Sequence, residues 1–128
     1  MIPGELNTAE KAAGDSEGLM EETSKVVVLI TAATEEEARS LAELLLNQRK
    51  AACVNIVPRV DSLFWWQGKL DSAQESLLIA KTRASLLPDI IEMVKMAHSY
   101  DVPEIIALPV IGGNEDYLRW VDSETEEG

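Results

Sequence analysis

The first regular feature of the chain is an unbroken run of apolar, mostly β-branched residues at positions 26–30, VVVLI. Such a run is typical of a strand that is buried on both faces, so we predict a strand near 25–33. The spacing then becomes helical, with Thr34 as N-cap and Glu37, three residues later, completing a capping box. A helix near 35–49 is therefore expected to follow the strand directly.

Two long extended segments come next, near 51–66 and 69–83, and Gly68 lies where the chain turns between them. Both exceed the usual strand length of about 5–6 residues, so this hairpin is expected to project beyond a domain of this size. Pro58 cannot donate a ladder hydrogen bond, which predicts an edge position or a bulge in the first segment.

A second helical pattern covers residues near 85–98, with Pro88 tolerated in its first turn. An apolar segment near 103–110 reads as a further strand. After a turn at 112–113, Asn114 is placed to cap a short last helix.

The predicted order is β-α-β-β-α-β plus a short helix, which is the α+β, ferredoxin-like pattern with an antiparallel sheet and a long central hairpin. Both long helices then cover one face of the sheet. The other face also carries apolar residues, so a second subunit is expected to cover it. The domain is expected to span 25–123, between a disordered or flexible acidic tail at 1–24 and an acidic C-terminal tail at 124–128.

Three consecutive aromatic residues, Phe64, Trp65 and Trp66, lie near the end of the predicted hairpin. Consecutive side chains on a strand point to opposite faces, so one thin hairpin cannot bury all three. They either pack within the monomer against a helix edge or, as we favour, pack on neighbouring chains, where Trp is enriched. A base-stacking surface is disfavoured because no cluster of Arg or Lys accompanies the aromatic residues.

The net charge of −12 is concentrated at the two ends of the chain. An acidic surface repels phosphate, which argues against nucleic acid or an anionic membrane as partner. The sequence contains no stretch that resembles a membrane span or a signal peptide, and it contains a single cysteine, so a cytoplasmic protein is expected.

His98 and Cys53 are the candidate soft-metal ligands. The alternatives are that His98 stabilises a helix terminus and that Cys53 is an inert core residue. The sequence has no Walker loop and no Gly-x-Ser-x-Gly elbow, and nothing in its spacing supports a nucleophile paired with His98, so we do not expect an enzyme.

Several separated motifs carry a resemblance to a known family. They are VVLITA at 27–32, AACVNI at 51–56, SLFWWQGK at 62–69, Lys81-Thr82, HSYDVPEIIALPV at 98–110, and YLRW at 117–120. In this order they resemble the CutA divalent-cation tolerance family, over nearly all of the chain from residue 25 to residue 121. The resemblance implies a homotrimer with PII-like architecture and a link to tolerance of copper(II) or another divalent cation. The residues expected at subunit clefts or interfaces are Phe64, Trp65, Trp66, Glu75, Lys81, Glu104 and Tyr117.

The chain departs from that family at three positions. Ile30 stands where some members have a cysteine regarded as a metal ligand, Ala97 where some have a second histidine, and Ser99 where most have proline. Two functions follow. One is a trimeric protein that binds divalent cations weakly through His98 and carboxylates. The other is a PII-like signalling or scaffold trimer that holds a small ligand or a partner in its subunit clefts.

Overall fold

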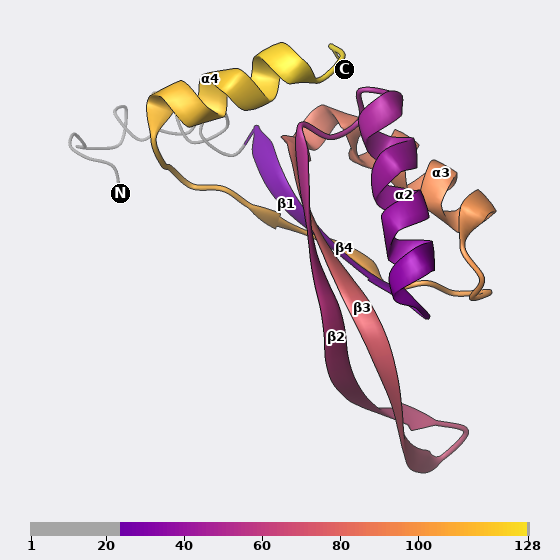
Figure 1. The fold of residues 1–128 in the computed structure, drawn as a ribbon. Helices are drawn as coiled ribbons and strands as arrows, with labels where there is room; N and C mark the ends of the chain where they lie inside the picture. Colours follow the sequence, from indigo (N-terminus) through magenta and orange to yellow (C-terminus); the bar gives the residue numbers. More distant parts are fainter. Residues whose placement is uncertain (1–23, 128) are drawn as a thin grey trace, which may run out of the picture.

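The computed structural model describes residues 24–127. The predicted tail at 1–24 therefore lies almost entirely outside the described residues. The elements follow the expected order, with one small addition, the 3-10 turn η1 (Figure 1): β1 (Lys25–Ala32), α2 (Glu35–Asn47), β2 (Cys53–Trp66), β3 (Lys69–Arg83), η1 (Ala84–Leu86), α3 (Leu87–Ala97), β4 (Ile105–Pro109) and α4 (Glu115–Glu124).

The four strands form one antiparallel sheet in the order β2-β3-β1-β4. Helices α2 and α3 lie together on one face, and the β2–β3 hairpin projects far beyond them, while α4 crosses the opposite end of the sheet (Figure 1). The predicted α+β, ferredoxin-like arrangement with a long central hairpin is confirmed. Among the described residues, no helix has the length and apolar character that a membrane crossing requires.

The hydrophobic core lies between the sheet and the α2–α3 layer. Alternate residues of β1 are buried, and they pack with the apolar stripes of both helices. The largest fully buried apolar side chains are Val28, Ile30, Leu41, Leu45, Leu78, Leu86, Ile90, Val94 and Val121.

Two local predictions can be compared with the geometry. The pairing of β2 with β3 shifts register between Val57 and Val60, so the irregularity expected at Pro58 is present, and β2 is an edge strand of the sheet. Thr34 caps α2 by accepting from the Glu37 N–H at 3.1 Å. The predicted reciprocal bond of the capping box, from the Thr34 N–H to the Glu37 carboxylate, is wrong, because that carboxylate accepts from the Ala33 N–H at 2.9 Å instead.

The C-terminal boundary also differs from the prediction of a tail at 124–128. Helix α4 includes Glu124, and Thr125 is almost fully buried. The Glu126 N–H donates to the Arg49 carbonyl at 2.9 Å, and its carboxylate pairs with Lys50. These acidic residues therefore belong to the folded domain, because the basic residues that follow α2 attract them.

Candidate functional site

The face of the sheet opposite α2 and α3 exposes apolar residues. Val27 pairs with Leu108, and Leu29 pairs with Ile106, so these four side chains form two adjacent rows. Leu108 is 49% exposed and Ile106 is 50% exposed, and the two β1 residues are half-buried. The expected apolar face is present, and none of the described residues 24–127 covers it.

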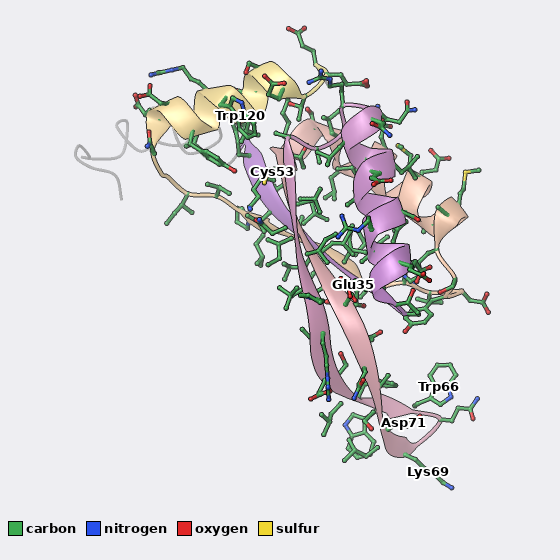
Figure 2. All side chains as sticks on the ribbon, viewed as in Figure 1. Glu35, Cys53, Trp66, Lys69, Asp71 and Trp120 are labelled. Carbon is green, nitrogen blue, oxygen red and sulfur yellow. The ribbon has the colours of Figure 1, made fainter. Side chains whose placement is uncertain are left out.

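The aromatic residues of the hairpin are also exposed within the single chain. Trp65 is 74% exposed, Trp66 is 59% exposed, and Phe64 is partly exposed. The alternative that they pack against a helix of the same monomer is therefore contradicted. Figure 2 shows Trp66 standing free of the sheet beside the end of the hairpin, with Asp71 nearby.

A cavity of about 740 Å³ lies between the hairpin and the segment that joins α3 to β4. This cleft is acidic and aromatic, and no basic residue belongs to its described lining. It is lined by Thr31, Ser62, Leu63, Phe64, Trp66, Asp71, Glu75, Tyr100, Asp101, Val102 and Glu104. Its volume is in the range of small-molecule sites, about 300–1,000 Å³.

A hydrogen bond joins the two walls of this cleft. The Tyr100 hydroxyl donates to the Glu75 carboxylate at 2.8 Å, across 25 positions of sequence. Burial first, and then the hydrogen bond and charge of Glu75, raise the pKa of Tyr100 to about 12. The phenol is therefore a neutral donor at physiological pH, and it holds one carboxylate in a defined place.

His98 lies behind the cleft, with its ring fully buried. Its Nε2 is 2.7 Å from the Thr31 carbonyl oxygen, and its Nδ1 accepts from the Tyr100 N–H at 3.0 Å. This pattern requires a neutral ring with the proton on Nε2. Neither nitrogen is free, so coordination of a metal by His98 would require one of these hydrogen bonds to break.

The carboxylate of Glu37 connects His98 to the start of α2. It accepts from the Ser99 N–H at 2.7 Å and from the Ser99 hydroxyl at 3.0 Å, in addition to Ala33. Burial raises the pKa of Glu37, but the hydrogen bonds from Ala33 and Ser99 outweigh burial, so that the pKa lies below its ordinary value. Glu37 is therefore a partly buried anchor for the segment that leads into the cleft.

Cys53, Lys81 and Tyr117 meet at the opposite end of the sheet. The Lys81 Nζ lies 3.9 Å from the Cys53 Sγ and hydrogen-bonds to Asn55. The pKa of Tyr117 is raised by burial and by neighbouring Cys53. Lys81 and Tyr117 line a second cavity of about 280 Å³ beneath α4. Figure 2 shows Cys53 below α4, far from the hairpin end.

The predicted site residues therefore divide into two groups. Phe64, Trp66, Glu75 and Glu104 line the large cleft, whereas Cys53, Lys81 and Tyr117 gather under α4, and Trp65 lines neither cavity. Among the described residues, no three His, Cys, Asp or Glu side chains form a group that could hold a metal ion, so Cys53 and His98 do not make a shared site.

Sequence reasoning missed the three other ionisable residues of the cleft, namely Asp71, Tyr100 and Asp101. Asp71 is the cross-strand partner of Phe64, so the hairpin register alone would have placed a carboxylate beside that ring. Tyr100 and Asp101 lie in a loop, where no periodicity indicates their direction.

Comparisons with known proteins give the family. The model of the CutA1 divalent ion tolerance protein matches residues 26–124. Protein CutA 1, chloroplastic, of Oryza sativa is 48% identical over 84% of this chain, which spans only 63% of the rice protein. The divalent-cation tolerance protein CutA of Thermus thermophilus is 50% identical over 77% of this chain and 96% of its own length.

A solved structure extends the match to three dimensions. The crystal structure of CutA1 from Oryza sativa superposes with a TM-score of 0.80 at 48% identity, covering 81% of this chain and 95% of that one. Sequence motifs, fold and alignment agree over the same residues. The chain therefore belongs to the CutA1 divalent ion tolerance family.

Proposed function

We propose that this protein is a homotrimer of CutA type that binds divalent cations weakly, through carboxylates of the cleft between the hairpin and the 100–104 segment. The observation that carries the proposal is the lining of that cleft, where Asp71, Glu75, Asp101 and Glu104 supply four carboxylates and no basic residue opposes them. Such a site attracts cations and repels phosphates.

The surface of the single chain supports assembly. Both outer strands of the sheet, β2 and β4, have an unpaired edge among the described residues, and β4 carries exposed Ile106 and Leu108. Exposed edges and apolar faces favour pairing with another chain. Joining two different edges is a head-to-tail contact, which closes into a ring when the rotation between copies allows it. A threefold ring uses both edges of every copy.

Carboxylate oxygens suit hard divalent cations, and they also bind copper(II) less tightly than imidazole or thiolate does. Because the described residues form no ready group of three ligands, the affinity of one chain is expected to be low. The proposal assigns the cation to Glu75 and Glu104 rather than to His98, whose nitrogens are both hydrogen-bonded.

A second function is favoured by one observation, the presence of aromatic walls in the cleft. A PII-like trimer that holds a small ligand or a partner at subunit clefts would use Phe64 and Trp66 as contact surfaces. The carboxylates disfavour a nucleotide as that ligand, because they repel its phosphates. Under either function we propose a cytoplasmic binding protein rather than an enzyme, consistent with a neutral, fully hydrogen-bonded His98 that is not placed as a general base.

Titration calorimetry with calcium, zinc and copper(II) tests the cation site. The Glu75→Gln/Glu104→Gln double variant is expected to lose most of the binding, whereas Glu43→Gln, at an exposed position of α2, serves as the matched control. Light scattering on the same samples reports assembly. Unchanged binding by the double variant would remove the cleft from the proposal.

A further inference from the structure

The acidic cleft has a property that a site for bare metal ions does not require. Aromatic side chains alternate with its carboxylates. Phe64 is the cross-strand partner of Asp71, and Tyr100 is hydrogen-bonded to Glu75. Trp66 completes the aromatic set at the hairpin end.

The first pair places a carboxylate opposite an aromatic residue across the hairpin, and the second places a carboxylate at the hydroxyl of an aromatic residue. A cation that lies over an aromatic face gains attraction from the ring quadrupole, and Trp is the best of the three partners. A hydrated metal ion gains little from such walls, because its water shell keeps it away from the rings. An organic cation with a weakly hydrated apolar surface uses both the charge and the rings.

The volume and the charge of the cleft further limit the class of ligand that it can bind. A volume of about 740 Å³ exceeds what a single ion needs and matches a small organic molecule. Among the described residues that line the cleft there is no Lys, Arg or His, so a phosphate or carboxylate group of a ligand would meet no positive charge there.

We propose that this cleft binds a small organic cation, a quaternary or alkylated ammonium compound, with its positive charge among the carboxylates of Asp71, Glu75 and Glu104 and its apolar groups against Phe64, Tyr100 and Trp66. The inference rests on the proposed function, because both place a cation among the same carboxylates. The Tyr100 hydroxyl orients Glu75, and its raised pKa keeps that donor neutral.

The experiment uses the full chain and two probes of the same shape, choline and its uncharged carbon isostere 3,3-dimethylbutan-1-ol, in calorimetric titrations. We expect choline to bind and the alcohol to bind at least tenfold more weakly, because the carboxylates contribute little to the binding free energy of a neutral ligand. Glu75→Gln should reduce the preference for charge, because one carboxylate of the cleft is lost, while it keeps an acceptor for Tyr100.

The aromatic walls have a matched pair of variants. Trp66→Leu is expected to weaken choline binding about tenfold, by loss of one cation–π contact, whereas Met96→Leu, at an exposed position of α3 outside the cleft, should leave the affinity unchanged. Phe64→Leu gives a second aromatic test, and light scattering of each variant separates loss of the ligand from loss of assembly.

The outcomes separate this inference from the proposed function. Choline binding that follows Glu75 and Trp66 supports it. Absence of choline binding, equal binding of the alcohol, or unchanged affinity in both the Trp66 and Phe64 variants would overturn it. Calcium, zinc and copper(II) titrations of Trp66→Leu report the metal site alone, because that variant keeps every carboxylate. Metal binding without choline binding therefore leaves the proposed function standing.

Discussion

The strongest test of the proposed assembly is removal of the two hairpin tryptophans. In the single chain, Trp65 is 74% exposed and Trp66 is 59% exposed. Trp66 also lines the cleft, so the buried area is worked for Trp65 alone: if its side chain offers about 200 Å² of surface, full burial on a neighbour removes roughly 150 Å² from water per subunit. At about 25 cal/mol per Å² this is at most about 4 kcal/mol per subunit. That amount is a large share of the free energy of an assembly of small chains.

We therefore expect the Trp65→Ala/Trp66→Ala variant to dissociate or aggregate, while the native protein has a mass near three times 14.1 kDa in multi-angle light scattering. The monomer itself should stay folded, because neither side chain belongs to the core. Circular dichroism checks this point. Met96→Ala is the control, since Met96 is an exposed apolar residue on α3, away from the open sheet face.

Two results would refute this reasoning. A native mass near 14.1 kDa at micromolar concentration would remove the assembly altogether. An intact trimer in the double variant would show that the open sheet face and the strand edges hold the subunits together without the hairpin.

Three further outcomes are expected. His98→Ala should lower the free energy of unfolding by about 3 kcal/mol, because it removes a buried ring and two hydrogen bonds. The same variant should leave the copper(II) electron paramagnetic resonance spectrum unchanged, and loss of that signal would show that His98 is a ligand. Because the pKa of Glu37 is lowered in the folded protein, its stabilisation is complete above the unfolded pKa and is lost as pH falls through the folded pKa. In Glu37→Gln the melting temperature should therefore fall less steeply with decreasing pH than in the native protein. An equally steep decrease would contradict this. Deleting residues 1–22 should leave the melting temperature nearly unchanged in calorimetry, because their composition offers little apolar surface, and a large decrease would show that the segment packs on the domain.

Local chemistry made much of the fold predictable. The apolar run at 26–30, the Thr34 cap and the Pro58 interruption each depend on neighbours in sequence, and each appears in the structure as a strand, a helix start and a register shift. The exposed hairpin aromatics follow from strand alternation alone. In these cases the residues that decide the structure lie within a few positions of one another.

The cleft could not be predicted in the same way. It joins Glu75 on β3 to Tyr100 in a loop, and the turn of that loop depends on His98 and on the Ser99 contacts with Glu37 of α2. No periodic pattern in the sequence indicates that these residues come together. The hydrogen bonds of His98 were hidden for the same reason, since the Thr31 carbonyl that it contacts lies 67 positions away.

The attachment of the C-terminal residues has a consequence for the order of folding. Arg49 pairs with Glu124 across 75 positions, and Lys50 pairs with Glu126 across 76. Contacts of such separation close late, because the entropy of the intervening chain must be lost before they form. Residues 122–126 are also synthesised after every element that they touch. The sheet and its two covering helices can therefore collapse first on the growing chain, and α4 closes over the Cys53 end of the sheet as one of the last events.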